Sequence, residues 1–180
     1  MPFSINNFRA NLTGQGARPN LFEITVPFPT AVATGEAGQK ITFMCKTAQL
    51  PGADLGLVEV PYFGRNIKLA GNRTFAEWTT TIINDEDFAV HAGLTNWMNG
   101  INTHATNERT FAGTDYQVDA IVKQYTKSGD VAKEITIINC WPASVAPIEL
   151  GWDQNDAIEE YAVTWQYDYW QANDGVHQTT

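Results

Sequence analysis

Short apolar segments separated by Gly and Pro constrain the fold of this chain more than any other feature. No internal repeat, charge run or low-complexity linker divides its 180 residues. This pattern predicts a domain that is mainly β, an antiparallel β-sandwich or barrel with one flanking α-helix. We expect a single domain over residues 1–180, with a flexible N-terminal segment at about 1–16 and a C-terminal tail at about 171–180.

The predicted strands are rich in β-branched and aromatic residues. They lie at residues 20–28, 40–47, 74–84, 116–127, 131–141 and 157–170. In the second of these, Ile41, Phe43 and Cys45 alternate with more polar residues, as in a half-buried strand. Ser128, Gly129 and Asp130 predict a hairpin turn, and Pro142 and Pro147 interrupt the pattern after it.

The last predicted strand has one heavily aromatic face and one mixed, polar face. Alternation along 157–170 predicts that the aromatic face carries Tyr161, Val163, Trp165, Tyr167 and Tyr169. Such a face is a core, a subunit interface or a carbohydrate platform. For a strand of this length, core or interface is the favoured interpretation.

Two further segments depart from the strand pattern. Residues 85–99 are expected to form the helix, because Val90, Leu94, Trp97 and Met98 recur at helical spacing after an acidic start. Residues 50–71 hold prolines, glycines and apolar side chains, and Pro61 confines any strand there to a sheet edge. Residues 29–39 and 102–113 are polar and are expected to be loops.

The charge balance and the first residues of the chain disfavour several functions. With 11 Lys and Arg against 20 Asp and Glu, the formal net charge is −9, which disfavours tight binding to nucleic acid or anionic lipid. The first residues lack the basic and apolar regions of a secretory signal, so we expect folding in a cytoplasm. Cys45 and Cys140 are then expected to be reduced, buried small hydrophobes.

Searches for catalytic and metal-binding patterns identify no candidate residue. The cysteines and histidines lack zinc-ligand spacing, no serine lies in a G-x-S-x-G motif, and no phosphate-binding glycine loop is present. We therefore expect no catalytic residue, cofactor or metal. A carboxylate-dependent glycosidase or a carbohydrate-binding β-sandwich remains the remote alternative, which two close carboxylates with separated pKa values in a deep aromatic cleft would favour.

Several stretches follow one another in order along the chain: ARPNLF from residue 17, FMCKTAQLP from 43, NIKLAGNRTFAEWT from 66, NDE from 84, IVKQY from 121, WP from 141 and DYW from 168. These stretches resemble the tail tube protein family of contractile-tailed bacteriophages. Each is weak alone, and together they are specific over residues 17–170. The segments 29–39, 102–113 and beyond 170 depart from the family pattern.

The resemblance implies a structural subunit whose hexameric rings stack into a hollow conduit for DNA inside a contractile sheath. Its implied partners are further copies of itself, the sheath protein, baseplate tube-initiation proteins and the tail terminator, with DNA as transient cargo and no membrane. The implied location is the virion tail, assembled in the host cytoplasm. The fold is similar to tubes of type VI secretion and other contractile injection systems, which is the alternative context.

Candidate site residues follow from this interpretation. We expect contacts between subunits or rings at the segment 50–71 and just after it, through Leu50, Pro51, Leu55, Leu57, Val58, Pro61, Tyr62, Phe63 and Arg73. Acidic residues on polar strand faces are the candidates for lining the channel. These are Asp119, Glu134 and Glu160, and sequence alone leaves open which face points inward.

Overall fold

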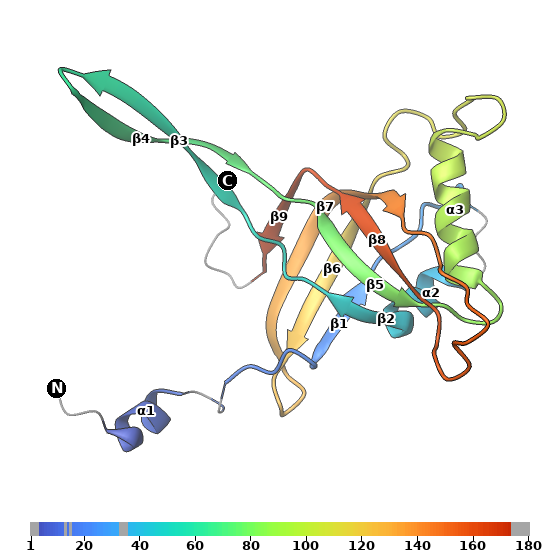
Figure 1. Cartoon of the computed structure of the whole chain (residues 1–180), viewed down its shortest axis with the longest axis horizontal. Coiled ribbons are helices and arrows are strands. Elements are labelled where there is room, and N and C mark those ends of the chain that lie inside the picture. Colours follow the sequence, from blue (N-terminus) through green and yellow to red (C-terminus); the bar gives the residue numbers. More distant parts are fainter. Residues whose placement is uncertain (1–3, 13, 15, 33–35, 174–180) are drawn as a thin grey trace.

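The computed structural model describes residues 4–12, 14, 16–32 and 36–173 (Figure 1). The helices in this part of the chain are α1 (Ile5–Asn11), α2 (Ala37–Met44) and α3 (Ala89–Ile101). The strands are β1 (Phe22–Thr25), β2 (Cys45–Ala48), β3 (Asp54–Tyr62), β4 (Arg65–Thr74), β5 (Trp78–Ile83), β6 (Val118–Tyr125), β7 (Val131–Val145), β8 (Glu160–Gln166) and β9 (Tyr169–Ala172). The mainly β, antiparallel fold predicted from the sequence is confirmed.

One long strand joins the two layers of the body. The first half of β7 pairs with β6 and β9, and its second half pairs with β8. We call the layer β1-β6-β7-β9 the first sheet, and the layer β2-β5-β8 with the second half of β7 the second sheet. Every pairing is antiparallel.

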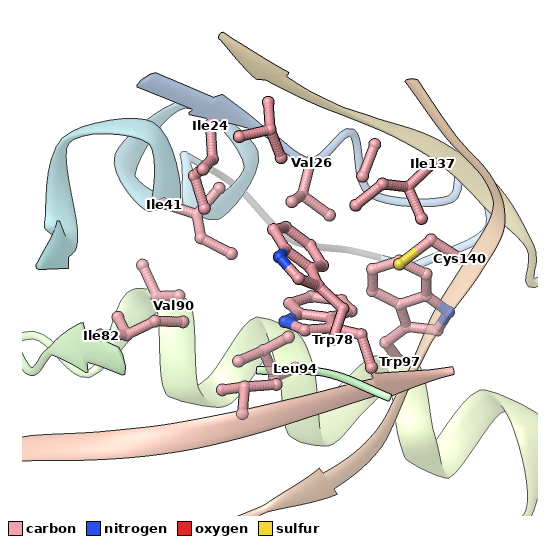
Figure 2. Packing of buried hydrophobic residues seen from close by; sticks show 14 of the residues in the cluster. Ile24, Val26, Ile41, Trp78, Ile82, Val90, Leu94, Trp97, Ile137 and Cys140 are labelled. Carbon is pink, nitrogen blue, oxygen red and sulfur yellow. The ribbon is translucent and has the colours of Figure 1, made fainter. Parts of the chain in front are cut away.

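The core lies between these two layers, where alternate residues of each strand point inward. Figure 2 shows Ile24 and Ile137 from the first sheet facing Trp78 and Ile82 from the second. Trp165 is fully buried, and its indole N–H donates to Thr80 Oγ1 at 2.9 Å, so the buried hydroxyl has a partner. The alternating aromatic face predicted for Tyr161, Val163 and Trp165 is confirmed by their burial.

Helices α2 and α3 pack against each other and against both sheets beside this core. In α3, Val90, Leu94 and Trp97 are buried while Asn96 is exposed, as the helical spacing predicts. The Trp97 indole N–H donates to the Tyr116 carbonyl at 2.8 Å. Helix α3 is therefore fixed to the body by an apolar face and by one directional bond.

The start of α3 differs from the prediction. The helix begins at Ala89 rather than at residue 85, because Phe88 has a left-handed backbone with φ of 53°. The preceding acidic residues instead form a turn and bind Lys40 of α2, through Asp85 at 3.1 Å and through Asp87. These acidic side chains therefore connect two helices, and Asp87 also accepts from the Ala89 backbone N–H at the start of α3, at 3.0 Å.

The prediction of a strand at residues 40–47 is wrong over its first half. Helix α2 ends at Met44 and β2 begins at Cys45. Ala37 and Ile41, four residues apart, are buried against β1 and α3, whereas Phe43 is 83% exposed. The burial of Ala37 and Ile41 on one side of a helix favours the helix over the strand that the short alternating pattern predicted. The prediction of a loop at 29–39 is wrong from Ala37 onward, where α2 begins. Residues 33–35 of that segment lie outside the described residues.

Two boundaries in the C-terminal half were also predicted wrongly. Strand β7 continues through Pro142 to Val145, since in the described residues this half of β7 pairs with β8 alone and the proline removes no ladder bond. The strand expected at 157–170 is split between β8 and β9. The chain passes from the second sheet to the first between them, which leaves Tyr169 41% exposed.

Candidate assembly surfaces

Strands β3 and β4 form a separate two-stranded sheet that projects from the body (Figure 1). Nine residues of β3 at about 3.3 Å per residue give an arm of roughly 30 Å. Every residue of β3 is exposed, as are nearly all of β4. A hairpin of this kind is only marginally stable alone in water, so its free faces need a partner.

The register of the hairpin gathers apolar side chains on one face. Val58 pairs with Leu69 and Val60 pairs with Ile67, while the intervening pair, Glu59 with Lys68, points to the other face. These four apolar residues are 41–51% exposed. A contiguous exposed apolar strip of this kind is typical of a protein interaction surface.

The tip of the hairpin is a turn with two left-handed residues. Phe63 has φ of 42° and Gly64 has φ of 82°, the conformation of the tight turns that suit the strand twist. Asn-Gly is the usual pair in such a turn, and a bulky residue at positive φ is an outlier. Phe63 is nevertheless 91% exposed, with its ring against Tyr62 at 4.6 Å between centroids.

The base of the hairpin is fastened to the body by two tryptophans. The indole N–H of Trp170 donates to the Gly52 carbonyl at 3.0 Å, and that of Trp78 donates to the Gln49 carbonyl at 2.8 Å. Both bonds lie in the segment that leads into β3. The arm therefore leaves the body at a defined point, although its length is exposed.

The structure places the predicted contact residues on this arm or at its base. Exposed members are Leu50, Leu55, Leu57, Val58, Pro61, Tyr62, Phe63 and Arg73, while Pro51 is half-buried. Sequence reasoning missed Val60, Ile67 and Leu69, which complete the apolar face. The alternation of Ile67 and Leu69 with polar residues over 65–70 was a signal for two of these three residues.

The first sheet has two edges that are unpaired among the described residues, β1 and β9. Neither edge strand contains proline. The second sheet also has two edges that are unpaired among the described residues, the second half of β7, which carries Pro142, and the four-residue strand β2, which has no proline. Unpaired, proline-free edges are ready to pair with other strands, whereas a proline blunts an edge.

The face of the first sheet that points away from the core is mixed and polar. Glu23, Lys123, Glu134 and Thr136 lie on it, and Lys123 Nζ lies 3.6 Å from a Glu134 carboxylate oxygen. Asp119 lies at the bulge of β6, where its carboxylate accepts from the Asn139 backbone N–H at 3.1 Å. The structure thus puts Asp119 and Glu134 in one sheet.

Glu160 lies apart from these two carboxylates, at the start of β8 in the second sheet. Its carboxylate forms an ion pair with Lys46 of β2 at 2.5 Å. The three candidate channel residues are therefore divided between two layers, with their side chains on opposite outer faces of the sandwich.

Exposed apolar side chains also gather in two places that the sequence did not indicate. The loop at residues 147–160 exposes Leu150, Trp152 and Ile158. Helix α1 exposes Ile5 and Phe8 along one side, after a cap by Ser4. A three-residue spacing was visible in α1, but seven residues are too few for a reliable pattern.

No group of three or more His, Cys, Asp or Glu in the described part of the chain is arranged to hold a metal ion. The ammonium of Lys40 lowers the pKa of Asp87, and burial raises the pKa of Cys45 to about 12. Both cysteines are free thiols, and no described helix is long and apolar enough to cross a membrane.

Comparison with known proteins identifies the family of this chain and its structural role. The family model for phage tail tube protein matches residues 17–173. The chain belongs to the phage tail tube protein family. The tail tube protein gp19 of Enterobacteria phage T4 is 36% identical over 165 residues, which cover 91% of this chain and 96% of that protein. The resemblance noted in the sequence is confirmed, and the chain is a structural component of a phage tail.

Solved structures of tube components share the fold of this tail tube protein at low identity. The tube-terminating cap of the anti-feeding prophage has a TM-score of 0.62 at 16% identity, covering 87% of this chain and 90% of that one. The extended sheath–tube complex of an extracellular contractile injection system gives 0.54 at 14% identity, covering 95% and 98%. These structures therefore share the overall fold of this chain over most of its length.

Proposed function

We propose that this tail tube protein closes into hexameric rings through the edges of its first sheet and stacks those rings through its β3–β4 hairpin. The hollow stack is the conduit through which DNA leaves the virion, inside a contractile sheath. The observation that carries the proposal is the hairpin, an arm of roughly 30 Å with an unpartnered apolar face. The relatives are phage proteins, which supports a phage tail over another injection system.

Ring closure is assigned to β1 and β9. Pairing β1 of one copy with β9 of the next would satisfy the free backbone groups of both edges and join the first sheets into one ring-wide barrel. A head-to-tail contact that closes in this way leaves no free edge in the first sheet, and axial contacts then build a tube. The two edges of the second sheet, β2 and the half of β7 that carries Pro142, would stay outside the barrel.

The channel wall would then be the polar face of the first sheet. Glu23, Asp119 and Glu134 give three carboxylates there against the ammonium of Lys123, a net charge of −2 for each copy. Like charge keeps duplex DNA from forming the phosphate contacts that would arrest it, within a screening length of about 8 Å. In this arrangement Glu160 lies away from the channel, paired with Lys46.

Other tail proteins complete the assembly. The outer surface of the ring would contact the sheath protein, while the two ends of the tube would contact baseplate tube-initiation proteins and the tail terminator. The fold similarity to a tube-terminating cap and to a tube inside a sheath supports these partners. Assembly would take place in the cytoplasm of the bacterial host, before the tail joins the virion.

Hairpin shortening tests the proposal. Val58 and Leu69 are register partners, so replacing residues 58–69 with Asn-Gly removes the outer arm and leaves a regular turn. We expect the shortened subunit to unfold at the same temperature as the parent and to form no tubes by negative-stain microscopy, with baseplate components supplied to both. Tubes of normal length from the shortened subunit would refute the proposal.

Point variants sharpen this test. Val58→Thr with Val60→Thr makes the hairpin face polar but keeps β-branched residues in the strand. Val131→Thr is the matched control, because Val131 is a valine of similar exposure on β7. We expect the hairpin variant to raise the subunit concentration needed for tubes and the control to leave it unchanged.

A further inference from the structure

The 147–160 loop presents exposed apolar side chains together with acidic side chains. Trp152 is fully exposed, and Leu150 and Ile158 are 81% and 70% exposed. The same loop holds five carboxylates and no Lys or Arg. Two of them have partners, since Glu159 accepts from the Asn84 amide and Glu160 pairs with Lys46. An exposed tryptophan beside unpaired carboxylates is typical of an interface anchor whose partner is basic and partly apolar.

The outer part of the hairpin, residues 58–69, has the complementary composition. It carries Arg65 and Lys68 against the single carboxylate Glu59, next to its apolar face and the exposed rings of its tip. It is thus a basic and apolar element in a protein whose net charge is −9. Opposite charges flanking apolar contacts favour correct register between two surfaces and suppress wrong ones.

The two surfaces lie at opposite ends of the body. Strand β5 follows the hairpin and starts at Trp78, which pairs with Trp165, while its far end, Ile83, pairs with Glu160 where the loop ends. Figure 1 shows the hairpin and this loop extending from the body in opposite directions. A second copy displaced along that direction therefore brings its hairpin toward the loop of the first, as a head-to-tail contact requires.

The loop also encloses space for a side chain. An open hollow of about 560 Å³ is lined by the apolar residues Ile148, Leu150 and Ile158 and by the polar residues Glu149, Gln154, Glu159 and Glu160. The Phe63 ring, held outward at the hairpin tip in an unfavourable backbone conformation, is a candidate to fill it. Ile158 and Leu150 provide apolar contact, and the carboxylates lie within the same loop as partners for cations.

We infer that the 147–160 loop is the receptor for the β3–β4 hairpin of a second copy in the adjacent ring, with Trp152 as its apolar anchor. This inference rests on the proposed function, because it names the surface that receives the stacking arm. The hairpin supplies the aromatic tip and the cations Arg65 and Lys68. The loop supplies the hollow, the tryptophan and the carboxylates Glu149, Asp153 and Asp156.

Quenching of tryptophan fluorescence by acrylamide tests the burial of Trp152. In unassembled subunits Trp152 is the most exposed tryptophan of the described chain, so we expect it to dominate the quenchable fluorescence, and Trp152→Phe to remove that fraction. In tubes of this protein alone the fraction is expected to disappear. Tubes in which Trp152 stays fully quenchable would overturn the inference while leaving tube formation, and so the proposed function, intact.

Charge exchange tests the identity of the partner. We expect Arg65→Glu with Lys68→Glu to block stacking, and Glu149→Lys with Asp153→Lys to do the same, each raising the subunit concentration needed for tubes by about tenfold or more. Combining all four substitutions is expected to restore tubes. Glu108→Lys with Asp115→Lys is the control, since these exposed carboxylates lie outside the loop.

The outcomes separate the two proposals. If the parent protein forms tubes and the loop variants stack as well as the control, the receptor assignment is overturned and the tube function stands. If Trp152 is protected from quenching in tubes but the variant with all four substitutions forms no tubes, the loop contacts another surface. The pairing of the loop with the hairpin is then overturned. If the folded parent protein forms no tubes, the proposed function itself fails.

Discussion

Removing the Trp97 ring tests how the body of the subunit is held together. Its indole is fully buried, with ring centroids 5.3 Å from Phe28 and 5.9 Å from Trp165. Trp97→Ala removes these contacts, leaves a cavity and strands the Tyr116 carbonyl, for an expected loss of about 3–5 kcal/mol in the free energy of unfolding. A domain of this size is stable by roughly 5–15 kcal/mol, so the variant should fold with little reserve.

A second substitution separates packing from hydrogen bonding at the same position. Trp97→Phe keeps most of the ring but loses the N–H that binds the Tyr116 carbonyl, and we expect it to lose about 1–2 kcal/mol. The neighbouring Asn96 is exposed, so Asn96→Ala should change stability by less than about 0.5 kcal/mol. The asparagine therefore serves as a matched control on the same helix.

Urea unfolding of unassembled subunits, followed by circular dichroism, measures all three variants. Working below the concentration at which tubes form keeps the assembly energy out of the result. The loss in the free energy of unfolding is expected to be smallest for Asn96→Ala, larger for Trp97→Phe and largest for Trp97→Ala. If Trp97→Ala loses less than about 1 kcal/mol, α3 does not pack on the core as described here.

Three further variants extend these tests. Burial raises the pKa of the Tyr161 phenol, so the unfolded state ionises first and stability falls as pH rises above about 10; thermal unfolding of Tyr161→Phe between pH 9 and 11 should depend less on pH. Gly93→Ala brings a methyl group to 2.9 Å from the Ala37 side chain and 3.1 Å from Phe28, and should lower the free energy of unfolding by about 1–2 kcal/mol. Thr25→Lys adds a cation to the proposed channel face, and virions carrying it should eject DNA more slowly at low salt; an unchanged rate would contradict the channel assignment.

The sequence predicted most accurately those elements whose residues are buried on one regular face. Alternation over Tyr161, Val163 and Trp165 and the helical spacing of Leu94 and Trp97 each identified the correct inward face. The core imposes one period on such residues, so the pattern is visible in the chain itself. Family resemblance added the biological role, which no local pattern carries.

The wrong boundaries have a common physical cause. The segment at Ile41 alternates like a strand, but its burial against α3 comes from residues far along the chain, and no local rule contains that information. Pro142 likewise lies in a strand because of a distant partner, Trp165 of β8. The expected flexibility at residues 1–16 is a prediction that stays open; α1 lies within that segment, and residues 174–180 of the expected tail lie outside the described residues.

The candidate contact surface was predictable in part. Prolines, glycines and exposed apolar residues marked 50–71 as an excursion, although its form as a regular hairpin with one apolar face depended on the cross-strand register. The 147–160 loop gave no such signal, because single apolar residues such as Trp152 in a polar loop are common at protein surfaces. Only its exposure, and its position opposite the hairpin, indicate a role.

Electron cryo-microscopy of tubes assembled from the purified protein tests the central claim most directly. We expect rings in which β1 of each copy pairs with β9 of its neighbour, the polar face of the first sheet lines the channel, and the β3–β4 hairpin reaches the adjacent ring. Tubes in which both edges stay unpaired, or in which the hairpins lie free of the next ring, would contradict the account.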